Sequence, residues 1–77
     1  MTATQAILDV PAISCSHCKM AIEGAVGGVA GVQQTVVDVS EKSVTIDFDA
    51  DQVTLDALEA AVRDEGYEVA GRRVVDL

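Results

Sequence analysis

The chain has 77 residues, which is enough for one small domain with one hydrophobic core. Its 13 acidic and 5 basic residues give a net charge of −8, which argues against nucleic acid and against an anionic membrane surface as partners. Hydrophobic residues make up 49% of the chain but aromatic residues only 3%, so the core must be mainly aliphatic. We expect residues 1–77 to form a single domain.

The N-terminal residues Met1–Gln5 have neither the basic start nor the apolar stretch of a secretory signal. No apolar run approaches the roughly 20 residues that span a bilayer. These features predict a cytoplasmic protein that does not insert into membranes. In a reducing compartment, a Cys-x-x-Cys pair more often binds metal or performs redox chemistry than forms a structural disulfide.

The first predicted elements are a strand, a loop and a helix. Apolar side chains alternate in the strand, which Pro11 ends, and residues 11–17 are expected to form the loop. Ser16 is a candidate cap for the helix, and Ser14 is the alternative. The strand is indicated by Ala6, Leu8 and Val10, the helix by an apolar stripe of Ile22, Ala25, Val26 and Val29, and the end of the helix by Gly27, Gly28 and Gly31.

A hairpin is predicted next. Residues Val32–Val39 are rich in β-branched side chains, and Val44–Phe48 alternates between apolar and polar residues. The polar stretch Ser40–Ser43 is expected to form the turn between these two antiparallel strands.

The second predicted helix has clear start and stop signals. Thr54 is its expected N-cap, and Val53 with Leu58 is expected to form a hydrophobic staple across that cap. Gly66 is expected to adopt the left-handed conformation that follows many helices. The buried stripe of this helix is expected to be Leu55, Leu58, Ala61 and Val62.

The last strand is predicted at Tyr67–Ala70, with a prolongation through Arg72–Val75. The order is therefore β-α-β-β-α-β. Because each βαβ crossover is normally right-handed, both helices should cover one face of a four-stranded antiparallel sheet. The predicted class is α+β, with the ferredoxin-like βαββαβ sandwich as its architecture.

The chemically informative segment is Cys15-Ser16-His17-Cys18, which holds both cysteines of the chain. The predicted helix begins here, and a helix N-terminus favours the thiolate form that binds metals. Two sulfurs without a carboxylate select a soft metal such as Cu(I), whereas Zn(II) prefers four ligands. Thiol–disulfide chemistry and incidental cysteines are the alternatives, although a thioredoxin-like protein has a longer chain and a different element order.

The chain resembles the heavy-metal-associated domains of bacterial copper chaperones from about Ala6 to Ala70. In that family the loop usually reads Gly-Met-x-Cys-x-x-Cys, and the Met packs beneath the loop without binding metal. Here Ala12-Ile13 replaces Gly-Met, and Ile13 can fill the same space although its χ1 is stiffer. The resemblance rests on Ile13–Cys18, on Ile22 four residues after the second cysteine, on Gly31-Val32, and on Glu65-Gly66-Tyr67.

The resemblance implies a function without enzyme chemistry. Cys15 and Cys18 would bind Cu(I) and transfer it by ligand exchange to the metal-binding domain of a copper-transporting P-type ATPase. Many relatives also form a metal-bridged homodimer. Ser14 stands where zinc-transporting relatives often carry Asp, which favours copper over Zn(II); Hg(II) is a further alternative. A metal-binding domain of the transporter itself would have the same sequence features.

Other side chains have two interpretations each. His17 is either an auxiliary ligand or an exposed loop residue, and Tyr67 either approaches the thiolates or packs at the start of a strand. Met20 is expected on the surface, out of phase with the apolar stripe. An acidic concentration in the second half is expected to be a solvated surface, with partner docking as the alternative: Asp47, Asp49, Asp51, Asp56, Glu59, Asp64, Glu65 and Glu68.

Overall fold

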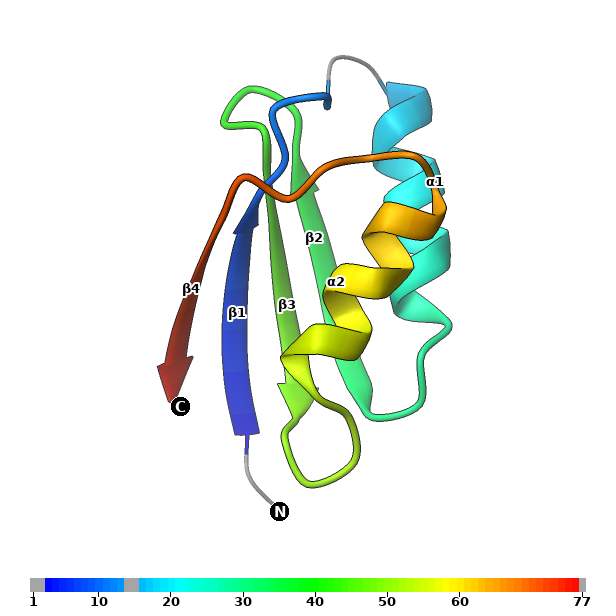
Figure 1. Cartoon of the computed structure of the whole chain (residues 1–77). Helices are drawn as coiled ribbons and strands as arrows, with labels where there is room; N and C mark the ends of the chain where they lie inside the picture. The colour runs from blue at the N-terminus through cyan, green and yellow to red at the C-terminus, as the bar shows by residue number, and fades with distance from the viewer. Residues whose placement is uncertain (1–2, 14–15, 77) are drawn as a thin grey trace.

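The computed structural model describes residues 3–13 and 16–76. The elements are β1 (Ala3–Asp9), α1 (Ser16–Gly27), β2 (Val32–Asp38), β3 (Ser43–Asp49), α2 (Leu55–Asp64) and β4 (Gly71–Asp76). The strands form one antiparallel sheet in the order β2-β3-β1-β4, and both helices lie on the same face of it (Figure 1). The chain therefore has the predicted ferredoxin-like βαββαβ fold.

The core lies between the sheet and the two helices. In β1 and β3 every second side chain is buried, as the alternation of apolar residues predicts. The central strands contribute Ala6, Leu8, Val44, Ile46 and Phe48, and the helices contribute Ile22, Val26, Leu58 and Val62. Neither helix in the described part of the chain has the length and apolar character needed to cross a membrane.

The start of α2 is built as predicted. Thr54 has an extended backbone conformation, and its side-chain oxygen accepts a hydrogen bond from the Ala57 N–H at 3.2 Å. Val53 and Leu58, on either side of this cap, are both buried in the core. The cap satisfies a backbone donor that would otherwise lack a partner within the helix.

The end of α2 is a Schellman motif. Gly66 has φ +90°, and its N–H donates to the Arg63 carbonyl at 2.8 Å. The Tyr67 N–H donates to the Val62 carbonyl at 3.4 Å. The prediction of a left-handed Gly66 is confirmed, and the motif turns the chain toward the sheet.

The prediction that Tyr67–Ala70 forms the last strand is wrong. This segment crosses from the end of α2 to the outer side of β1, and β4 begins only at Gly71 (Figure 1). Tyr67 and Val69 pack against the core, whereas Glu68 and Ala70 are exposed. The alternation therefore arises because every second side chain covers the core, and not because the segment pairs as a strand. Pairing with β1 begins where the Ala70 N–H donates to the Asp9 carbonyl at 2.8 Å.

Three predicted boundaries shift by one or two residues. Strand β2 ends at Asp38, and β3 already includes Ser43. Helix α1 begins at Ser16, so this residue is the first of the helix rather than its cap, and the loop is shorter than predicted. The alternative cap, Ser14, lies outside the described residues.

Candidate metal-binding site

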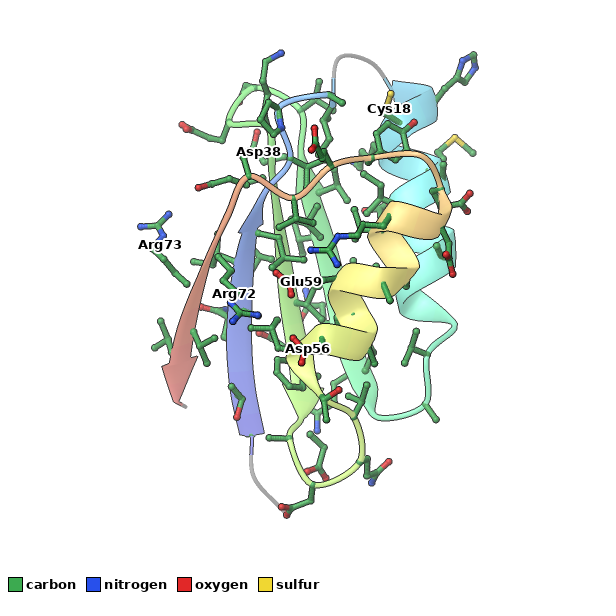
Figure 2. All side chains as sticks on the ribbon, in the orientation of Figure 1. Cys18, Asp38, Asp56, Glu59, Arg72 and Arg73 are labelled. Carbon is green, nitrogen blue, oxygen red and sulfur yellow. The ribbon has the colours of Figure 1, made fainter. Side chains whose placement is uncertain are left out.

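Cys18 lies on the first turn of α1, as predicted. Its side chain is half-buried and packs against the edge of the core. The sulfur lies at the end of the molecule where α1 begins (Figure 2). Cys15 falls outside the described residues, so the structure places one of the two predicted ligands.

The chain leading into the loop is anchored by Ile13. This side chain is fully buried, with an exposed fraction of 0%. The Ile13 N–H donates to the Val10 carbonyl at 3.1 Å, and the Val10 N–H in turn donates to the Lys42 carbonyl at 2.9 Å. Ile13 therefore packs in the core, as expected for it.

The start of α1 has an electrostatic character suited to thiolates. The first turn contains no acidic residue, and Lys19 is exposed within it. The N-terminus of a helix carries a partial positive charge from its aligned peptide dipoles. A carboxylate here would oppose thiolate formation, whereas this helix end and Lys19 favour it.

The family model described as the heavy-metal-associated domain matches residues 7–68. The chain belongs to the heavy-metal-associated domain family. The match begins within β1, includes the chain from there through α1 that carries both cysteines, and ends before β4 begins.

Relatives of this heavy-metal-associated domain include copper chaperones. It is 35% identical over 66 residues to the copper chaperone CopZ of Staphylococcus aureus, an alignment that covers 86% of this chain and 97% of that protein. A solved CopZ metallochaperone superimposes with a TM-score of 0.84 at 35% identity, covering 86% of this chain and 98% of the other.

A second structural relative comes from a transporter. The N-terminal domain of a potential copper-translocating P-type ATPase from Bacillus subtilis, solved in its Cu(I)-loaded state, has a TM-score of 0.80. Its identity is 24%, and the match covers 95% of this chain and 92% of the other. At that identity the likeness shows a common fold.

The other predicted site residues occupy different environments. His17 is exposed on the first turn of α1, and Met20 is 68% exposed, which confirms its predicted surface position. Tyr67 is half-buried and packs against the core. In residues 3–13 and 16–76 no group of three or more His, Cys, Asp or Glu side chains is placed to hold a metal. The cysteine pair therefore remains the candidate metal site.

The turn between β2 and β3 lies at the same end of the molecule as the start of α1 (Figure 1). The Asp38 carboxylate accepts hydrogen bonds from the Ser40 hydroxyl at 2.7 Å, the Ser40 N–H at 3.0 Å and the Glu41 N–H at 3.1 Å. The Ser40 hydroxyl, the two backbone N–H groups and the charge of Lys19 lower the pKa of Asp38. The side chain of Asp38 therefore orders this turn.

Two acidic residues expected on the solvated surface are buried instead, at 3% exposure for Asp49 and 6% for Glu59. Glu59 lies on the sheet-facing side of α2, where Arg72 of β4 reaches it at 2.9 Å and also contacts Asp56 at 3.3 Å (Figure 2). The sequence contained a sign of this burial, because Glu59 is four residues after Leu55 and three before Val62, and residues at these spacings share one face of a helix. This ion-pair cluster joins α2 to the edge strand β4.

Asp49 is part of the β3–α2 connection. Its carboxylate accepts hydrogen bonds from the Asp51 N–H at 3.0 Å and from the Gln52 side-chain amide at 3.4 Å. Its backbone N–H donates to the Gly31 carbonyl at 2.8 Å. Burial of this carboxylate is compensated by such bonds, and the residue orders the chain before α2.

Proposed function

We propose that this heavy-metal-associated domain is a cytosolic Cu(I) metallochaperone. Cys15 and Cys18 would bind the metal as two thiolates and release it by ligand exchange. The observation that carries the proposal is the half-buried Cys18 on the first turn of α1, within the segment that the family model matches. The 35% identity to a copper chaperone supports copper as the metal.

The arrangement suits binding and release. Two thiolates satisfy Cu(I), a soft ion with low coordination requirements, and each thiol gives up a proton when the metal binds. Because Cys18 is at the surface end of α1 rather than deep in the core, an incoming thiolate can approach the metal. Copper would pass through sulfur-coordinated intermediates with three ligands, without a change of oxidation state.

The proposed acceptor is the metal-binding domain of a copper-transporting P-type ATPase. The common fold with the Bacillus subtilis transporter domain is consistent with two similar domains meeting end to end. A metal-bridged homodimer is the related proposal, in which the exposed His17 supplies an auxiliary ligand. Tyr67 lies in the chain that follows α2 and packs against the core. In this proposal its side chain would limit the access of water to the thiolates.

Two other proposals use the same loop. This domain can itself belong to a transporter, in which case copper would move within one protein. Thiol–disulfide exchange by Cys15 and Cys18 is the alternative of a different class. Reduction of insulin by the protein, together with a measured Cys15–Cys18 reduction potential, would identify the redox function.

The experiment that tests the proposal is an anaerobic Cu(I) titration of the reduced protein against a coloured competing chelator. Parallel titrations with Zn(II) and Hg(II) test the metal preference. We expect the protein to withdraw about one Cu(I) per chain, or a copper-bridged multiple, and to bind Zn(II) far more weakly. Failure to compete for Cu(I) would overturn the chaperone proposal.

A further inference from the structure

We propose that Lys42 is a positioning residue for the metal loop, a role that rests on the proposed function. In this proposal Lys42 braces Val10–Ile13, the stem of the chain that leads to Cys15. Lys42 has φ +53° and is the one non-glycine residue with positive φ in the part of the chain that the structure describes. An L-residue in this conformation carries a steric cost, and such costs concentrate at functional places.

The left-handed conformation of Lys42 accompanies two contacts to the stem. Its carbonyl accepts a hydrogen bond from the buried Val10 at 2.9 Å. Its ammonium lies 3.5 Å from the carbonyl oxygen of Pro11. The backbone and side chain of one residue therefore contact two successive residues of the stem, Val10 and Pro11, shortly before the buried Ile13.

The turn that ends at Lys42 is itself fixed. Three hydrogen bonds to the Asp38 carboxylate order Ser40 and Glu41. The charge of Lys19, which follows Cys18 in α1, contributes to the lowered pKa of Asp38. The turn thus contacts the chain before the cysteine pair through Lys42, and it lies at the same end of the molecule as the start of α1 (Figure 1).

A glycine would satisfy the backbone requirement without steric cost. The backbone hydrogen bond from Val10 does not depend on the side chain at position 42. What lysine adds is the ammonium contact with Pro11. The proposal that Lys42 holds the stem therefore predicts separate effects for the backbone and for the side chain of this residue.

The test uses four variants of the full chain. Lys42→Met removes the ammonium and keeps the length of the side chain, while Lys42→Arg restores a cation. Lys42→Gly relieves the steric cost and also removes the side chain. Glu41→Gln is the matched control, because Glu41 is exposed in the same turn and engages Asp38 only through its backbone N–H. Amide hydrogen exchange of Ile13 in the metal-free protein and Cu(I) competition are measured for each.

We expect Lys42→Met to accelerate exchange at Ile13 and to weaken Cu(I) retention by about two- to fivefold, the range of an exposed charged contact. Lys42→Arg should restore both values, and Glu41→Gln should match the parent. Lys42→Gly should raise the unfolding midpoint while loosening the stem as Lys42→Met does. If Lys42 only stabilised the fold, the unfolding midpoint would change together with the exchange at Ile13 and the Cu(I) retention.

Parental exchange and Cu(I) retention in both Lys42→Met and Lys42→Gly would overturn the brace. If the parent protein does not bind Cu(I), the proposed function fails instead. Exchange at Ile13 in the metal-free variants then still decides whether Lys42 holds the stem.

Discussion

Helix α2 has Asp56 in its first turn and Arg63 in its last, whereas α1 has neither an acidic residue at its start nor a basic residue at its end. The charges of α2 complement its dipole, and both of its ends are closed by hydrogen bonds. The first turn of α1 instead has no acidic residue and carries Cys18. The features of α2 stabilise the helix, whereas we propose that the start of α1 serves to bind a metal through thiolates.

The surroundings of the two helices differ in the same way. α2 is tied to β4 by Arg72, which pairs with Glu59 and Asp56. α1 packs on β2 and on α2, and it presents exposed His17, Lys19 and Met20 near its start. Substitutions in α1 and α2 should therefore separate metal binding from folding.

The largest expected effect is on metal binding. Cys15→Ser or Cys18→Ser removes one proposed ligand of the metal. Because loss of a residue that merely supports a metal ligand costs about 10- to 100-fold in affinity, loss of a ligand should cost more than about 100-fold. Cu(I) competition measures this loss, and circular dichroism should show that the metal-free fold remains. Tight Cu(I) binding by either variant would contradict the two-thiolate site.

Helix α2 should show the opposite behaviour. Leu58→Ala removes a fully buried side chain and should lower the free energy of unfolding by about 2–5 kcal/mol. Leu55→Ala, at a half-buried position of the same helix, is the control and should cost less. Urea unfolding measures both. The folded Leu58→Ala protein should bind Cu(I) as the parent does; a large loss of affinity would break the proposed separation.

The link between α2 and β4 should have an intermediate effect. Arg72→Met leaves the buried Glu59 carboxylate without its guanidinium partner, but the Arg72 side chain is 52% exposed, so solvent weakens the pair. We expect a loss of about 1–2 kcal/mol in the free energy of unfolding. Arg73→Met, at an exposed neighbouring position, is the control. Equal losses in the two variants would contradict a role for the ion pair.

The cap of α2 should have a smaller effect. Thr54→Ala removes the oxygen that accepts the Ala57 N–H, which should cost about 1 kcal/mol. Thr54→Ser keeps that oxygen and should recover most of the loss. Thermal unfolding compares the three proteins. An unchanged midpoint in Thr54→Ala would show that this end of α2 does not depend on its cap.

The smallest effect concerns acid stability near the start of α1. The pKa of Asp38 is lowered from its ordinary value of 3.8, so the folded protein binds fewer protons there than the unfolded chain. Its stabilisation is present above pH of about 3.8 and is lost as the pH falls through the lowered pKa. Asp38→Asn should flatten this part of an acid-unfolding curve. An identical curve for parent and variant would rule out this contribution.

The sequence predicts those parts of the fold that depend on local pattern. Alternation locates β1 and β3, Thr54 and Gly66 locate the ends of α2, and the cysteine motif locates the start of α1. Tyr67–Ala70 was misassigned because its alternation has the period of a strand, while the pairing partner of each strand is a tertiary property. The burial of Glu59 likewise depends on Arg72, which is distant in the sequence.

The candidate site follows the same division. Cys18 and Ile13 occupy the positions that the motif predicts. The contact between Lys42 and the stem could not be anticipated, because it joins the β2–β3 turn to residues far away in the chain. The left-handed conformation of Lys42 marks this place in the structure, but lysine rarely adopts it, so the residue type does not predict it.

The most direct test of the central claim is copper K-edge X-ray absorption of the one-to-one Cu(I) complex, with the Cys15→Ser and Cys18→Ser proteins as references. The account predicts a first shell made of sulfur in the parent protein, at low coordination number, and its loss in each variant. A first shell dominated by nitrogen or oxygen, or a parental spectrum from either variant, would contradict the claim that two thiolates at the start of α1 hold the metal.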